Sequence, residues 1–173
     1  MFWIELNAAV PQQLEPEILN DVRHRPRLAA EPVTRHLLYV EDNTANMRLV
    51  ERLVERRSDI RLLGANTGPR GVEIARESKP DVILMDINLP GLNGFDAMRI
   101  LAADTRTSAI PVIAISANAM PHDLTRGMQA GFFRYLTKPI KVQEFMDTLD
   151  AALKFLGERE NLASNEPVNE TDT

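Results

Sequence analysis

Four short apolar runs in the sequence each end in residues that could do chemistry. Two of them end in carboxylates, Glu41-Asp42 and Asp86, one ends in the hydroxyl of Ser116, and one ends in the ammonium of Lys138. Open α/β sheets bind their ligands at the carboxyl ends of the strands. We therefore expect these side chains to lie in one cleft.

The three carboxylates Glu41, Asp42 and Asp86 would repel one another if they were packed together. A hard divalent cation relieves that repulsion, and Mg2+ prefers oxygen ligands and keeps several of its waters. No histidine or cysteine stands at these strand ends to favour a softer metal. The residue types therefore predict a Mg2+ site.

A carboxylate beside Mg2+ can act as a nucleophile toward phosphorus, and Asp86 is the candidate for that role. Mg2+ on one side and Lys138 on the other would balance the charge of the transferring phosphoryl group. Ser116 can donate a hydrogen bond to a phosphoryl oxygen. Pro139 follows the lysine, and a cis Lys138-Pro139 bond in a tight turn would fix the direction of the side chain.

Apolar runs and helical periodicities alternate along the chain and predict five strands and five helices. The strands are expected at 36–41, 60–65, 82–86, 111–116 and 132–137, and the helices follow each of them. Such alternation is typical of a doubly wound parallel sheet. Arg61 and Arg134 mark the second and fifth strands as edges, so we predict the order 2-1-3-4-5 of the flavodoxin-like fold.

The totals exclude several classes of protein. A net charge of -5 and a pI near 5.3 argue against a surface built to bind nucleic acid. There is no cysteine, no apolar stretch long enough for a membrane span, and no secretory signal at the start, so the expected location is the cytoplasm. Four prolines between 11 and 32 make 1–35 an expected linker, and the polar, acidic segment 157–173 is expected to be disordered.

The chemistry-bearing motifs together resemble the receiver domain of two-component response regulators. Glu41-Asp42, Met85-Asp86 with Pro90-Gly91, Ser116-Ala117 and Lys138-Pro139 appear in the family's order, and the resemblance spans 36–156. Glu41 stands where the family most often has Asp, and Ser116 where it most often has Thr. Both substitutions keep the chemistry that the motif requires.

The resemblance assigns expected roles to single residues. It implies that Asp86 accepts a phosphoryl group from the phosphohistidine of a histidine kinase or histidine phosphotransfer protein. It implies a Mg2+ site made by Asp42, Asp86 and the backbone carbonyl of Asn88, with Glu41 acting directly or through water. Tyr135 matches the switch aromatic that turns inward when Ser116 moves toward the phosphate.

The resemblance also indicates how such a chain is regulated and used. Asn88 and Asn118 stand where the family tunes the lifetime of the phosphate, and a downstream protein is expected on the face of helix four, strand five and helix five. The segments 115–120 and 136–140 are similar to receivers attached to hybrid sensor kinases, and 2–6 resembles the last strand of a kinase ATP-binding domain. No phosphoacceptor-histidine region and no Gly-rich ATP lid is found in the sequence, so we expect neither ATP binding nor kinase activity.

Two other functions compete with a phosphoacceptor signalling domain. A Mg2+-dependent phosphohydrolase would use Asp86 as its nucleophile, but it usually carries a second Asp two residues later, where this chain has Asn88. A structural pseudo-receiver would bind partners without phosphate. It would be expected to lack Asp86, Asp42 or Lys138, and all three are present.

Overall fold

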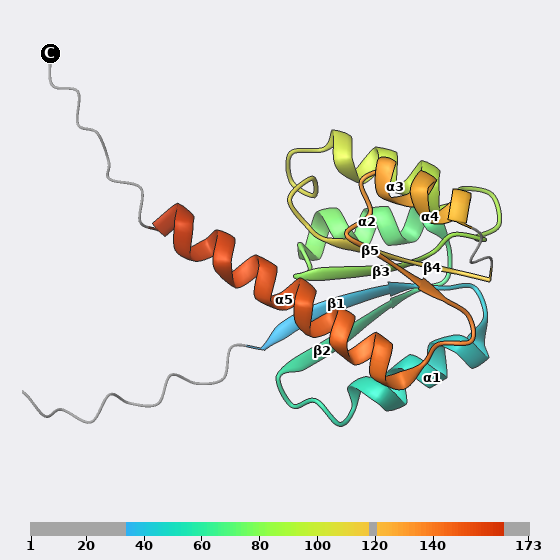
Figure 1. Ribbon diagram of the computed structural model, residues 1–173, viewed down its shortest axis with the longest axis horizontal. Helices are drawn as coiled ribbons and strands as arrows, with labels where there is room; N and C mark the ends of the chain where they lie inside the picture. Colours follow the sequence, from blue (N-terminus) through green and yellow to red (C-terminus); the bar gives the residue numbers. More distant parts are fainter. Residues whose placement is uncertain (1–33, 118–120, 165–173) are drawn as a thin grey trace, which may run out of the picture. The chain divides into compact units, whose positions relative to one another are not determined.

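The computed structural model describes residues 34–117 and 121–164, and these form one parallel sheet flanked by helices (Figure 1). The strands are β1 (Arg35–Val40), β2 (Ile60–Ala65), β3 (Val82–Asp86), β4 (Val112–Ser116) and β5 (Arg134–Thr137). The helices are α1 (Thr44–Val54), α2 (Gly68–Ser78), α3 (Gly94–Ala103), α4 (Pro121–Gln129) and α5 (Val142–Ser164). The predicted alternation of strands and helices is confirmed.

The five-stranded sheet has the order β2-β1-β3-β4-β5, and all neighbouring strands are parallel. The predicted order and fold class are therefore confirmed. The central strands β3 and β4 are buried along their whole length, whereas Arg61 and Arg134 are exposed on the two edge strands. A charged side chain is tolerated there because an edge strand has a solvent-accessible face.

Each face of the sheet is covered by its own hydrophobic core. Alternate residues of a strand point to opposite faces, so β1 contributes Leu38 and Val40 to one core and Leu37 and Tyr39 to the other. The first core includes residues of α2 and α3, and the second includes residues of α1 and α5. The sheet is thus packed on both faces, as the doubly wound fold requires.

The helices begin at polar caps close to the carboxyl ends of the strands. The side chain of Asn43 accepts hydrogen bonds from the amides of Ala45 and Asn46, and the side chain of Asn93 accepts one from the amide of Asp96. Such side chains replace the partners that the first amides of a helix lack. The caps bring α1 and α3 to the strand ends where the predicted site lies.

Two strands are shorter in the structure than predicted, and the bounds of a third are shifted by one residue. β5 begins at Arg134 instead of 132, because Phe132 enters the first hydrophobic core and its ring stacks edge-on against Phe95 at 5.6 Å. β4 begins one residue later than expected, at Val112, and β1 covers Arg35–Val40, so Glu41 follows the strand.

The prediction that disorder begins at 157 is wrong for 157–164, where α5 continues to Ser164 (Figure 1). The helix passes Gly157 because contacts from distant parts of the chain hold its later turns. Arg159 donates a hydrogen bond to the carbonyl of Ala109 at 3.2 Å, and Glu160 pairs with Arg35 at 3.0 Å. The rest of the predicted tail, and the linker before residue 34, lie outside the described residues.

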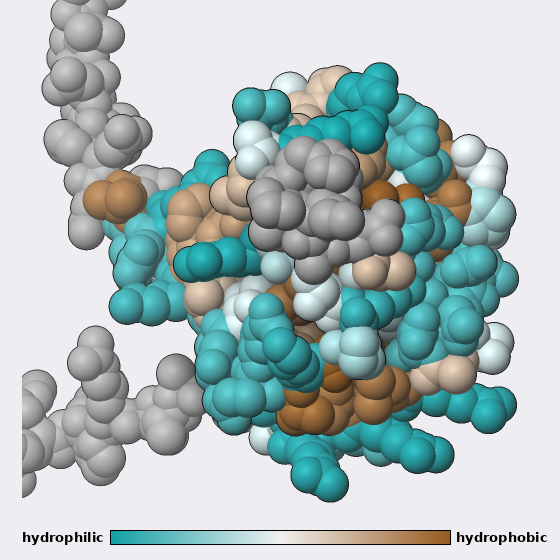
Figure 2. Space-filling view, turned by 45° about the vertical axis from the view of Figure 1, so that its right-hand side comes forward, coloured by the Kyte–Doolittle hydropathy of each residue, from teal (hydrophilic) through white to brown (hydrophobic). Residues whose placement is uncertain are grey.

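On the face seen in Figure 2 most of the described surface is hydrophilic, and hydrophobic residues show between the polar ones, mainly along its lower edge. Among the described residues the exposed large hydrophobic side chains are Leu49, Met128, Val142, Phe155 and Leu162. No helix within 34–117 and 121–164 has both the length and the apolar character that crossing a membrane demands.

Candidate functional site

The carboxylates predicted from the sequence meet at the carboxyl ends of β1 and β3. One carboxylate oxygen from each of Glu41, Asp42 and Asp86 lies within 4.8 Å of the others. Glu41 and Asp86 are buried, and Asp42 is exposed. The three line an open cleft of about 490 Å³, to which Lys138 also contributes.

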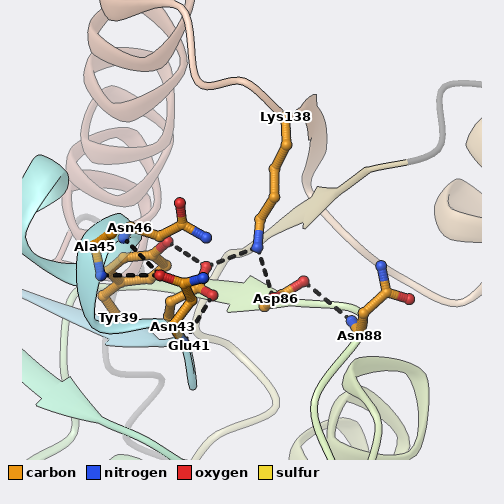
Figure 3. Close-up of polar contacts among 8 residues, drawn as sticks. All are labelled: Tyr39, Glu41, Asn43, Ala45, Asn46, Asp86, Asn88 and Lys138. Carbon is orange, nitrogen blue, oxygen red and sulfur yellow. Dashed lines mark hydrogen bonds and ion pairs between the residues drawn. The ribbon is translucent and has the colours of Figure 1, made fainter.

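Lys138 bridges two of these carboxylates (Figure 3). Its Nζ donates to Asp86 Oδ2 at 2.7 Å and to Glu41 Oε2 at 2.8 Å. Its backbone amide donates to the carbonyl of Ser116 at 2.7 Å, and the Lys138-Pro139 bond is cis, as the sequence suggested. The loop after β5 therefore directs the ammonium toward the end of β3.

The charges in the cleft influence one another. Burial raises the pKa of Asp86, and the negative charge of Glu41 adds to this, although hydrogen bonds from Lys138 and the amide of Asn88 oppose it. Burial alone would also raise the pKa of Glu41, but hydrogen bonds from Lys138 and Tyr39 outweigh it and lower the pKa. Burial lowers the pKa of Lys138, and its two carboxylate partners more than reverse that effect, so the ammonium stays charged.

The donor set suits a hard divalent cation. Glu41, Asp42 and Asp86 offer only oxygen atoms, and the group contains neither histidine nor cysteine. Lys138 balances one of the three formal negative charges, which leaves an excess that a divalent cation would neutralise. The residues present therefore fit Mg2+. Asn88 lines the same cleft, and its amide donates to Asp86 Oδ1 at 3.0 Å.

Ser116 and Tyr135 line a second, smaller cavity beside the cleft. Its volume is about 280 Å³, and Asn88 lines both hollows. Ser116 ends β4 and is buried, whereas Tyr135 is half-buried on β5 and packs against Gly127 of α4. A Cβ added at Gly127 would lie 2.7 Å from the ring carbon Cδ2 of Tyr135.

The start of α3 packs closely against the backbone of Asp86. A Cβ added at Gly94 would lie 2.5 Å from the backbone oxygen of Asp86, so only a glycine allows this close approach. The side chain of Asn93 caps the helix. The backbone that carries Asp86 is thereby supported by α3.

The structure thus brings together Glu41, Asp42, Asp86 and Lys138, with Asn88 at the edge of the same cleft and with Ser116 and Tyr135 in the neighbouring cavity. Asn118, which the resemblance singled out for phosphate lifetime, lies outside the described residues.

The sequence reasoning did not recognise Tyr39 as a residue of the site. Tyr39 is fully buried in β1, and its hydroxyl donates to Glu41 Oε2 at 2.7 Å. The sequence counted Tyr39 only as part of an apolar run. Its spacing of two residues from Glu41 was the available signal, since residues i and i+2 of a strand share a face.

A family model, described as the response regulator receiver domain, matches residues 37–150. The protein PilH of Pseudomonas aeruginosa is 41% identical over 117 residues, which cover 68% of this chain and 96% of PilH. The polar-differentiation response regulator DivK of Brucella ovis is 39% identical over 121 residues, which cover 70% of this chain and 98% of DivK.

Solved structures show the same similarity. The receiver domain of the sensor histidine kinase PA1611 from Pseudomonas aeruginosa is 33% identical, with a TM-score of 0.62, over 72% of this chain and 98% of that domain. In that structure a magnesium ion is coordinated in the active-site cleft of the PA1611 receiver.

Proposed function

Since the chain belongs to the response regulator receiver domain family, we propose that it is a phosphoacceptor of a two-component phosphorelay and that Asp86 receives the phosphoryl group. The observation that carries the proposal is the position of the Lys138 ammonium, 2.7 Å from Asp86 Oδ2 beside a three-carboxylate group. Receivers of this family are signalling proteins, so the transfer would serve as a switch.

In the proposed reaction a carboxylate oxygen of Asp86 attacks the phosphorus of a phosphohistidine. The new P–O bond forms as the P–N bond breaks, and the imidazole nitrogen keeps the electron pair and takes up a proton from solvent. Lys138 would hold a phosphoryl oxygen by its charge, and the hydroxyl of Ser116 would donate to another. The Asn88 amide, which already donates to Asp86, orients the nucleophile.

A bound Mg2+ would supply charge neutralisation at the phosphoryl oxygens. We propose that Asp42, Asp86 and the backbone carbonyl of Asn88 would hold it, with Glu41 acting directly or through water. The oxygen-only donor set and the magnesium named for the similar PA1611 receiver support this assignment.

Ser116 and Tyr135 would transmit the effect of phosphorylation to the surface that binds a partner. The hydroxyl of Ser116 would move toward the phosphoryl group, and Tyr135 would turn into the space that opens. Support comes from the shared cavity of about 280 Å³ and from the packing of Tyr135 on α4 at Gly127. Asn88 and Asn118 are proposed to set the lifetime of the phosphate.

The proposed partners lie at two surfaces. A histidine kinase or histidine phosphotransfer protein would dock at the cleft, and a downstream protein would bind the face of α4, β5 and α5. Met128 of α4 is 55% exposed and Val142 of α5 is 52% exposed, and β5 is an edge strand of the sheet. The open edge of β5 supports the proposal, because the unpaired backbone groups of an edge strand can pair with another chain.

We further propose that the chain is most like the receivers attached to hybrid sensor kinases. The PA1611 receiver belongs to a sensor histidine kinase and supports it, whereas DivK is named a response regulator. An upstream coding sequence continuous with a kinase ATP-binding domain would establish it, and a stop codon directly upstream would refute it. In either arrangement we propose that the receiver works in the cytoplasm, where a kinase would phosphorylate it.

Acetyl phosphate and Mg2+ provide the direct test of the function. We expect the intact mass of the wild-type chain to rise by one phosphoryl group and that of Asp86→Asn to stay unchanged. Asp147→Asn, which removes an exposed carboxylate of α5, is the matched control and should gain the phosphoryl group like the wild type. No gain in the wild type would refute the proposal and favour a pseudo-receiver, and sustained turnover of a phosphate ester would favour a phosphohydrolase.

A further inference from the structure

Tyr39 is a polar residue in a core that is otherwise apolar. Its side chain is fully buried and packs in the hydrophobic core between the sheet and helices α1 and α5. Its hydroxyl points to the strand end, where it donates to Glu41 Oε2 at 2.7 Å (Figure 3). A buried hydroxyl that has a single strong charged acceptor fixes the position of that acceptor.

The carboxylate of Glu41 is held at both of its oxygens. Oε2 accepts from Tyr39 and from Lys138 Nζ, and Oε1 accepts from the amide of Asn43 at 3.2 Å. Tyr39 and Lys138 therefore share one oxygen atom. The position of that atom determines where the ammonium rests.

The same ammonium contacts Asp86. Nζ lies 2.8 Å from Glu41 Oε2 and 2.7 Å from Asp86 Oδ2, so a continuous chain of hydrogen bonds runs from Tyr39 through Glu41 and Lys138 to Asp86. Tyr39 lies in β1, Asp86 ends β3, Glu41 directly follows β1, and Lys138 lies in the loop after β5. Lys138 has the long, flexible side chain, which makes it the group that most needs a fixed partner.

We propose that Tyr39 is a positioning residue for phosphoryl transfer: its hydroxyl anchors Glu41 Oε2 and thereby holds the Lys138 ammonium at Asp86. The inference rests on the proposed function, since Lys138 acts there on the phosphoryl group. Without the hydroxyl, Oε2 would keep Lys138 as its main partner. The stronger pull of the less satisfied carboxylate would draw the ammonium away from Asp86.

Tyr39→Phe removes the oxygen and leaves the buried ring in place. At saturating Mg2+ we expect the rate constant for phosphorylation by acetyl phosphate to fall about tenfold, the change that corresponds to losing one hydrogen bond to a charged group. The matched control is Thr107→Val. It removes another buried hydroxyl, which donates to the carbonyl of Leu101 at 2.8 Å in the turn after α3, and it should leave the rate unchanged.

A double-mutant cycle identifies the path of the effect. If Tyr39 acts through Glu41, Tyr39→Phe will slow phosphorylation in the wild type and cause little further loss in a Glu41→Gln background. Independent losses that add in the double variant would overturn the proposal. A Tyr39→Phe rate equal to that of the wild type would overturn it as well.

A readout without phosphorylation separates this inference from the function on which it rests. In the unphosphorylated full chain we expect an NMR signal from the Lys138 ammonium, assigned by its absence in Lys138→Met, that shifts and broadens in Tyr39→Phe but not in Thr107→Val. An unshifted signal would refute the positioning role even if Asp86 is phosphorylated. If the signal shifts but the chain accepts no phosphoryl group, the effect of Tyr39 on Lys138 would be supported. Only the proposed function would then be refuted.

Discussion

Lys138 should have opposite effects on metal binding and on phosphoryl transfer. Its ammonium pairs with Glu41 and Asp86, so it already neutralises part of the negative charge that would attract a divalent cation. The same ammonium would stabilise a transferring phosphoryl group. Metal binding and phosphoryl transfer should therefore respond in different directions when the charge is removed.

Lys138→Met keeps much of the side-chain volume and removes the charge. We expect phosphorylation by acetyl phosphate to slow about a hundredfold, because one of the groups that balance charge in the transition state is lost. Mg2+ should bind at least as tightly as in the wild type, because a competing cation has gone. Isothermal titration calorimetry and the rate of mass gain measure the two effects.

Lys141→Met is the matched control for this variant, since Lys141 lies three residues later on the same loop and its side chain is 75% exposed. It should behave as the wild type in both measurements. Weaker Mg2+ binding in Lys138→Met, or an unchanged phosphorylation rate, would contradict the role assigned to Lys138.

For single residues, the sequence predicted which side chains lie close together better than it predicted the hydrogen bonds between them. Glu41, Asp86 and Lys138 could be placed together because each stands at or just after the end of a strand, and parallel strands bring their ends to one edge. The role of Tyr39 could not be recognised in the same way. A tyrosine in a buried strand is usually a packing residue, and only the 2.7 Å contact with Glu41 distinguishes it.

Among the elements, α4 is the helix that packs against Tyr135, the proposed switch residue. Its Gly127 leaves the room that the Tyr135 ring occupies, and Arg126 places its guanidinium 4.5 Å from the centroid of Phe95 on α3. These contacts join α4 to β5 and α3. A change in the position of the Tyr135 ring would therefore alter its packing against α4 at Gly127.

Gly127→Ala should disturb this contact. The added Cβ would lie 2.7 Å from the Tyr135 ring, so the ring or the helix must shift. We expect the free energy of unfolding to fall by about 1 kcal/mol, because overpacking outweighs the better helix propensity of alanine. Urea denaturation followed by circular dichroism measures the change.

Gly157→Ala is the counterpart in α5, where an added Cβ would have no atom within 4 Å. Alanine is favoured over glycine inside a helix, so the free energy of unfolding should rise by about 0.5–1 kcal/mol. A loss of stability at Gly157, or a gain at Gly127, would contradict the packing described for the two helices.

The sequence predicted the elements well and the end of the last helix poorly. Arg61 and Arg134 identified the edge strands, because a charge is costly in a strand covered on both faces. The last turns of α5 were missed because Gly157 and an acidic composition suggested that the helix had ended. Their support comes from Ala109 and Arg35, which are far away in the sequence.

For the whole molecule, the acidic cleft would link Mg2+ binding to folding. Glu41 and Asp42 directly follow β1 and Asp86 ends β3, so the group exists only when the sheet is formed. A ligand that binds only the folded chain stabilises it by mass action.

Mg2+ should therefore raise the thermal unfolding midpoint of the wild type. The stabilisation would be about 2.7 kcal/mol at a Mg2+ concentration one hundred times the dissociation constant. Asp42→Asn should lose most of the shift, whereas Asp96→Asn, in the first turn of α3, should keep it. An equal shift in all three proteins would mean that Mg2+ acts elsewhere on the chain.

The most direct measurement identifies the residue that becomes phosphorylated. The chain would be treated with acetyl phosphate and Mg2+, reduced with borohydride, which converts an aspartyl phosphate to homoserine, and sequenced by tandem mass spectrometry. We expect homoserine at position 86 and at no other aspartate. An unmodified Asp86, or homoserine at a different position, would contradict the assignment of Asp86 as the phosphoacceptor.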